Sequence, residues 1–119
     1  MSKVAMQGAT VIGAGATVAN ILTGQRYERV PFQGAMGTLY ASASVAGVTC
    51  ELNVGGRSIT PPAEANAQNR IPIVPDDHLI DGWEALEGKL IQITAVDTAG
   101  AGATLFWKVE LEEAQVEMV

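Results

Sequence analysis

The sequence predicts an all-β domain, an antiparallel sandwich or barrel, and three observations support this fold class. Apolar and polar residues alternate along several short stretches, which is the pattern of strands buried on one face. Turn-forming residues, 13 Gly and five Pro, separate these stretches at regular intervals. No stretch shows the periodicity of a helix longer than about two turns.

The composition is that of one folded domain. Of 119 residues, 48% are apolar and 17% are charged, whereas a disordered chain is less apolar and more charged. Aromatic residues contribute only 5%, so the core must consist mostly of Val, Ile, Leu and Ala. Because the chain shows no internal repeat or linker, we expect a single domain over residues 1–119, with residues 1–25 forming a Gly-rich arm or an edge segment.

The N-terminal region 8–24 is apolar but dominated by small residues, four of them Gly. A membrane span needs about 20 strongly apolar residues, and a signal peptide needs a basic start, so we expect neither. Gly13-Ala14-Gly15 is similar to a dinucleotide-binding loop, but Val18 stands where a Gly or Ala is required. The sequence favours two short β segments joined by a turn at Gly13–Gly15.

The middle of the chain predicts a hairpin of alternating strands. Two stretches have one apolar face: residues 38–46 with Leu39, Ala41, Ala43 and Val45, and residues 48–54 with Val48, Cys50, Leu52 and Val54. In the first stretch, the opposite face carries Thr38, Tyr40, Ser42 and Ser44. Gly55-Gly56 then predicts a tight turn into a second arm over residues 57–60, because both turn positions tolerate positive φ. Pro61-Pro62 ends that arm.

The next segments give weaker patterns. Residues 63–70 form either one helical turn or an irregular excursion, and residues 71–74 form an edge strand or extended segment containing Pro72. Pro75-Asp76-Asp77 has the chemistry of a turn. Within residues 81–88 we expect a short helical turn around Trp83–Leu86.

The C-terminal third predicts two further strands. In residues 90–96 one face carries Ile91, Ile93 and Ala95, and Leu90 and Val96 place apolar side chains on the other face. A flexible loop, Thr98–Ala103, leads to the clearest strand, with Leu105, Trp107, Val109 and Leu111 inward and Phe106, Lys108, Glu110 and Glu112 outward. Phe106 interrupts the charged face, either by chance or as a contact with another chain.

Charge is distributed unevenly along the chain. Residues 1–75 hold five Lys or Arg against three Glu, which gives +2, and residues 76–119 hold two Lys against ten Asp or Glu, which gives −8. No basic cluster occurs, so we expect no direct nucleic-acid binding. The acidic half is either a solvated surface or a face that meets a mildly basic face of the next copy.

No catalytic signature is present, and we expect neither an enzyme nor a cofactor. Cys50 is predicted to be a small buried hydrophobe, and a reactive thiolate would need His78, the only His, as its base. Asp76, Asp77 and Asp81 beside His78 could hold a hard cation, but the spacing of a calcium loop is absent and a turn is the simpler interpretation.

Other polar groups lack a catalytic arrangement as well. Ser42, Ser44 and Ser58 are predicted on strands without a base and an acid beside them. Glu84 and Glu87, three residues apart, would share one face of a helix, but no other residues form a substrate cleft with them.

The order of these features resembles a known family. It runs from Gly47–Arg57 through Pro61-Pro62, Ile71–Asp77 and Leu86–Ile93 to Ala101–Val109. Over residues 34–113 this order is similar to the small coat or shell proteins of tailless bacterial viruses, which are single jelly rolls. The resemblance implies eight strands in two sheets, many identical copies and interfaces in place of an active site. Coats that wrap a genome directly often carry a basic N-terminal arm, whereas residues 1–25 hold only Lys3.

The expected function is therefore that of a structural virion protein. The chain would assemble in the host cytoplasm with copies of itself and other virion proteins, as a capsid or coat subunit over a membrane or a second protein layer, or as a minor component of the shell. The alternative is a decoration, fibre or adhesin-like module that binds a surface or carbohydrate. The expected subunit contacts are Phe106 and the glycines of two predicted loops, namely Gly34, Gly37, Gly100 and Gly102, although these loops could also be plain turns.

Overall fold

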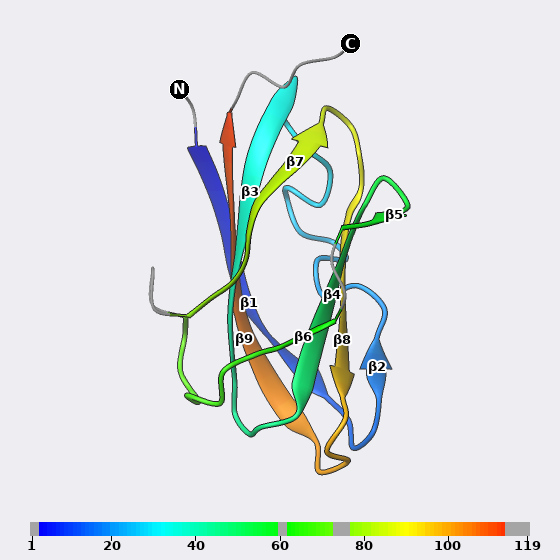
Figure 1. Cartoon of the computed structure of the whole chain (residues 1–119), viewed down its shortest axis with the longest axis vertical. Coiled ribbons are helices and arrows are strands. Elements are labelled where there is room, and N and C mark those ends of the chain that lie inside the picture. The colour runs from blue at the N-terminus through cyan, green and yellow to red at the C-terminus, as the bar shows by residue number, and fades with distance from the viewer. Residues whose placement is uncertain (1–2, 60–61, 73–76, 114–119) are drawn as a thin grey trace.

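The protein folds into two antiparallel sheets packed face to face (Figure 1). The computed structural model describes residues 3–59, 62–72 and 77–113, without the side chains of residues 78, 81 and 82. Within these ranges there are nine strands: β1 (Lys3–Ile12), β2 (Thr17–Val18), β3 (Gly34–Ala43), β4 (Val48–Val54), β5 (Arg57–Ser58), β6 (Ala63–Glu64), β7 (His78–Leu86), β8 (Ile91–Asp97) and β9 (Ala103–Glu113). No helix able to span a membrane occurs in the same ranges.

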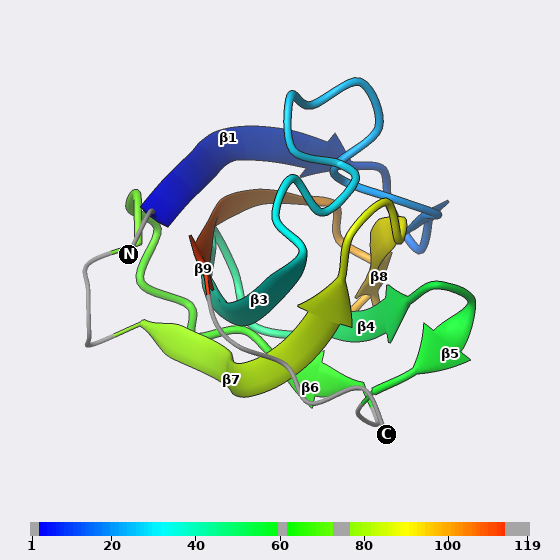
Figure 2. The ribbon, with the colours of Figure 1, turned by 90° about the horizontal axis from the view of Figure 1, so that it is seen from above.

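The strand order is that of a jelly roll. The first sheet has the order β1-β9-β3-β7, and the second has the order β2-β8-β4-β5, with β6 also paired to β4. Strands β1 to β4 therefore alternate between the two sheets, and so do β7 to β9, as in a jelly roll. Figure 2 shows the two layers from one end. The predicted all-β sandwich is confirmed.

The core lies between the two sheets and follows the predicted alternation. In β4, β8 and β9 every second residue is buried, with the faces assigned from the sequence. The long connection at residues 19–33 inserts Ile21, Leu22 and Val30 into this core. Asn20 fixes the start of that connection, because its Oδ1 accepts from the backbone N–H of Leu22 at 3.0 Å and of Ile93 at 3.1 Å.

The turn after β4 and the two N-terminal strands also agree with the sequence. Gly55 and Gly56 have φ of 62° and 82° and join β4 to β5, as a two-residue hairpin requires. β5 is shorter than predicted, although the N–H of Ile59 still bonds to the carbonyl of Leu52 at 2.9 Å. At the N-terminus, β1 and β2 are the two predicted β segments, and β1 begins at Lys3, earlier than expected.

Two predicted segments were wrong. Residues 83–86 form the end of β7 and not a helical turn, since Trp83 and Ala85 point into the core while Glu84 is exposed. Glu84 and Glu87 therefore share no helical face, and Glu87 follows the strand. Residues 34–37 belong to β3 and not to a loop.

Smaller corrections concern the segments around β3 and β6. β3 ends at Ala43, so Val45 lies beyond the strand and is 40% exposed. Residues 63–70 contain β6 and an irregular stretch, from which the carbonyl of Asn66 accepts the N–H of Ala43 at 2.7 Å. Of the predicted segment 71–74, residues 71–72 form no strand, and residues 73–74 lie outside the described ranges.

Two glycines on the inner face of the first sheet receive tryptophan rings. Gly37 lies directly across from Trp83, and Gly8 lies directly across from Trp107. A Cβ at Gly8 would lie 2.8 Å from the Trp107 ring, and a Cβ at Gly37 would overlap the Trp83 ring. Both positions require Gly because the facing indole occupies the space of a side chain.

Gly37→Ala is expected to lower the free energy of unfolding by about 1–3 kcal/mol, since the Trp83 ring must move to admit the methyl group. Urea denaturation of the purified variant measures this loss. Gly13→Ala is the control, because its Cβ would meet that of Ala16 at an ordinary 3.5 Å. Equal stability of the two variants would contradict the packing described above.

Candidate functional site

In the acidic turn, Asp77 makes structural contacts with other parts of the same chain. Asp77 is 1% exposed and receives Arg70 in two contacts, Nε to Oδ2 and Nη2 to Oδ1, both at 3.2 Å. Its carbonyl accepts the N–H of Ala41 at 3.0 Å, and this bond continues the pairing between β3 and β7 to the residue before β7. Asp76 and the side chains of His78 and Asp81 lie outside the described part of the chain. Among the residues that are described, no three His, Cys, Asp or Glu gather as a metal site.

Cys50 is a buried thiol, as the alternation of β4 predicts. Its side chain points into the core and is 0% exposed. Burial raises the pKa of the Cys50 thiol to about 12, because the thiolate would lose its hydration. The group is therefore a neutral hydrophobe at physiological pH and not a nucleophile.

A thiol reagent such as a nitrobenzoate disulfide is expected to leave Cys50 unmodified in the folded protein and to modify it stoichiometrically in concentrated urea. The absorbance of the released thiolate at neutral pH measures both reactions. Rapid labelling without denaturant would show that the thiol is accessible in the folded state and would overturn its assignment to the core.

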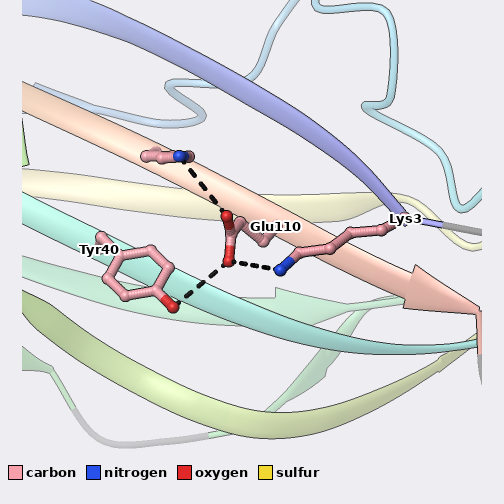
Figure 3. Close-up of polar contacts among 4 residues, drawn as sticks. Lys3, Tyr40 and Glu110 are labelled. Atoms are coloured by element: carbon pink, nitrogen blue, oxygen red, sulfur yellow. Dashed lines mark hydrogen bonds and ion pairs between the residues drawn. The ribbon is translucent and has the colours of Figure 1, made fainter. Parts of the chain in front are cut away.

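A charged cluster lies on the outer face of the first sheet (Figure 3). We call it the Glu110 cluster; it consists of Lys3, Tyr40, Lys108 and Glu110. Glu110 Oε1 lies 3.3 Å from Lys3 Nζ and accepts the Tyr40 hydroxyl at 3.3 Å, while Oε2 lies 3.5 Å from Lys108 Nζ. The cluster therefore ties together the three neighbouring strands β1, β9 and β3 through one carboxylate.

The strand order explains this cluster, and the sequence alone does not. Alternation placed Lys108 and Glu110 on the outer face of β9 correctly. However, Lys3 and Tyr40 reach Glu110 only because β1 and β3 flank β9 on either side. The cluster borders a hollow of about 270 Å³ that Met36, Thr38 and Glu112 also line.

A second and larger hollow lies between the β4–β5 hairpin and β7. Its volume is about 510 Å³, and Val54, Ile59 and Leu86 give it an apolar lining. Charged side chains also line it, namely Arg57, Lys89 and Glu84. The hollow therefore combines apolar and charged groups beside the edge strands β5 and β7.

The predicted contact residues fall in different surroundings. Phe106 lies on the outer face of β9, half-buried and directly opposite Ala9 and Ser42. Gly34 and Gly37 are buried in β3, and at Gly37 the missing side chain admits Trp83 of the same chain. Gly100 and Gly102 lie in the loop before β9, each with a φ of 80°.

Asp97 holds the loop that contains Gly100 and Gly102. Its carboxylate accepts four backbone N–H groups: Gly102 at 2.7 Å, Gly15 at 3.2 Å, Ala99 at 3.2 Å and Gly100 at 3.3 Å. These bonds, those from Gly102 and Gly15 above all, lower the pKa of Asp97 below its ordinary value, against a smaller opposing effect of desolvation. One carboxylate therefore joins the β1–β2 turn to the β8–β9 loop, a role that the sequence analysis missed.

Asp97→Asn is expected to destabilise the protein at pH 7, because the amide offers one acceptor oxygen where the carboxylate offers two. A lowered pKa in the folded state means that the ionised Asp97 stabilises the fold above the unfolded-state pKa of about 3.9. That contribution is lost as the pH falls through the still lower pKa of the folded state. Thermal unfolding at several pH values should therefore show a stability difference between wild type and variant that shrinks on acidification. A difference that stays constant down to about pH 2 would contradict this role.

No protein-family model matches this sequence, no curated protein is significantly similar to it, and no solved structure matches it. Within the described ranges the distinctive surface features are the Glu110 cluster, the two hollows and the sheet edges.

Proposed function

We propose that the protein is a structural virion protein, a capsid or coat subunit that assembles with copies of itself and with other virion proteins. The observation that carries the proposal is the jelly-roll order of the strands in the two sheets. Because a fold by itself hosts many functions, the proposal also needs support from the surface. The available surface consists mainly of sheet faces, sheet edges and tethered loops, which suit repeated contacts.

Rigidity supports the same role. A subunit that makes the same contacts many times needs a fixed shape. Each interface is weak by itself, and ordering flexible loops or side chains on association would weaken it further. Three polar anchors hold the connections of this chain: Asp97 on two loops, Asn20 on the 19–33 segment, and the Arg70–Asp77 pair beside β3. The core also consists largely of small aliphatic side chains, which lose little rotamer freedom on burial.

The position of the aromatic side chains favours a shell subunit over a carbohydrate-binding module. A sugar-binding surface generally presents exposed rings as a flat platform. Trp83 is 3% exposed and Tyr40 is 8% exposed, and the Tyr40 hydroxyl is engaged by Glu110. Tyr27 is half-buried and stacks with Arg26, whose guanidinium carbon lies 5.5 Å from the ring centre. Trp83 and Tyr40 are therefore unavailable for stacking on a sugar, and Tyr27 offers only part of its ring.

The charges support a position away from the genome. Lys3 and Lys108 bind Glu110, and Arg70 binds Asp77, so at least three of the seven basic side chains are paired with described residues of the same chain. Binding along a nucleic-acid backbone requires several unpaired cations on one face. We therefore place the subunit in the virion over a membrane or a second protein layer, after assembly in the host cytoplasm.

Light scattering and electron micrographs of the purified chain test this function. A closed particle, or a stable pentamer or hexamer, is the expected result at micromolar concentration. A monomer at every concentration that is instead retained on a polysaccharide column would overturn the proposal and support the carbohydrate-binding alternative. Repeating the measurement in high salt tests the charge pairing between halves, since screening should weaken it.

A further inference from the structure

Strand β1 is a long and regular strand at the edge of the first sheet (Figure 1). It pairs with β9 over ten consecutive residues without a register shift. Within the described ranges, no backbone hydrogen bond reaches residues 3–11 from outside the β1–β9 ladder. An edge of this kind presents unpaired N–H and C=O groups to any strand that approaches it.

The register identifies which backbone groups of β1 are unpaired. In an antiparallel pair, hydrogen-bonded and non-hydrogen-bonded positions alternate. Ser44 N–H donates to the carbonyl of Thr104 at 2.9 Å, so even-numbered residues of β9 point their backbone groups toward β3. Odd-numbered residues of β9 then bond to β1, where their partners are the even-numbered residues. Lys3, Ala5, Gln7, Ala9 and Val11 therefore direct their N–H and C=O groups away from the sheet.

The other sheet edges carry the features that prevent edge pairing, and β1 does not. β2 and β5 have only two residues each, and the β7 edge contains two register shifts against β3. Short strands and bulges both block continuous pairing. β1 has neither feature, and it contains no Pro.

The side chains along the free edge are small or neutral. Ala5, Gln7, Ala9 and Val11 are all exposed, and Val11 is 77% exposed. Lys3 carries the one charge of the strand, and its ammonium lies 3.3 Å from Glu110 (Figure 3). Because the Lys3 ammonium is paired with Glu110 of the same sheet, its charge opposes the approach of a second strand less than an unpaired lysine would.

We propose that β1 pairs antiparallel with β1 of a second copy, about a two-fold axis at Gln7. In this register Gln7 faces its own equivalent, Ala5 faces Ala9, and Lys3 faces Val11. All five residues with outward backbone groups are then hydrogen-bonded, and no like charges lie opposite each other. The strand is thus complementary to itself, as a two-fold interface requires. The two first sheets would join into one continuous sheet across the axis.

This pairing is a more specific form of the proposed function, because it identifies the interface through which two subunits associate. It rests on self-assembly as proposed above, yet it needs only two copies and not a closed shell. The edge pairing and the shell function can therefore be disproved independently, and a cross-linking experiment distinguishes the two cases.

Gln7→Cys tests the register directly. Hydrogen-bonded antiparallel partners have Cα atoms about 5.5 Å apart, which is within the roughly 4.4–6.8 Å range of a disulfide. A purified Gln7→Cys protein treated with copper phenanthroline should therefore run as a covalent dimer on a non-reducing gel. Cys50 does not compete, because its thiol is buried and neutral.

Val11→Cys is the matched control on the same strand. Both positions are exposed, Val11 at 77%, but the proposed register places Val11 opposite Lys3, so the two introduced thiols would be about 26 Å apart. Val11→Cys should form little dimer under the same oxidation. Equal cross-linking of both variants would indicate random collision and would overturn the register.

A pair of double variants tests the same register without a new thiol. In Ala5→Lys/Ala9→Lys, lysines of the two copies face each other twice across the axis, and self-association should weaken about tenfold. In Ala5→Lys/Ala9→Glu, opposite charges face each other, and association should be kept or strengthened. Sedimentation velocity over a concentration series measures both, with circular dichroism to show that each variant is folded.

The outcomes separate the two proposals. If the protein forms large assemblies but Gln7→Cys does not cross-link, the edge pairing is wrong and the shell function stands. If Gln7→Cys dimerises selectively but nothing larger than a dimer ever forms, the edge pairing stands and the shell function is wrong. Folded double variants that associate equally well would also overturn the edge pairing.

Discussion

The antiparallel pairing of β9 with β1 on one side and β3 on the other organises this molecule. β9 lies between β1 and β3 in the first sheet, and it pairs continuously with each of them. Its inward residues, among them Trp107 and Val109, form the centre of the core. Its outward Glu110 binds side chains from both neighbours. Its backbone register also determines which groups of β1 remain unpaired.

Alternation predicted the faces of β4, β8 and β9 because these strands have one side in the core and the other toward solvent. Under that condition a period of two in the sequence is also a period of two in burial. The same rule was incomplete for β3, where Tyr40 and Ser42 were assigned to the polar face but are buried. At the end of β3 the segment around Asn66 pairs beside Ser42, and the Tyr40 hydroxyl is bound by Glu110, contacts that alternation along β3 does not indicate.

The two wrong segments share one physical cause, because they pack against each other. Residues 83–86 include Glu, Ala and Leu, which favour a helix when considered locally. Register shifts against β3 also break the simple alternation of β7, so its strand pattern is hidden in the sequence. Opposite it, Gly34–Gly37 has the composition of a loop, yet Gly37 is needed to receive the Trp83 ring. Tertiary packing therefore overrides local preference on both strands.

The polar anchors show where sequence analysis reaches its limit. Ala99, Gly100 and Gly102 follow Asp97 within five residues, so their bonds form a local turn that a sequence pattern can indicate. The bond from Gly15 spans 82 positions, and the bond from Tyr40 to Glu110 spans 70. Such bonds follow from strand order, which alternation within single strands does not determine.

β1 separates stability from association along one strand. Its even-numbered residues point inward: Met6 and Ile12 are buried, Gly8 admits the ring of Trp107, and the Thr10 hydroxyl accepts the Trp107 N–H at 3.1 Å. The same residues make the hydrogen bonds to β9. Its odd-numbered residues contribute neither to the core nor to that ladder, so conservative changes at Ala5, Gln7, Ala9 and Val11 cost little folding energy. A strand built in this way can hold its own sheet with one half of its backbone groups and offer the other half to a sister molecule.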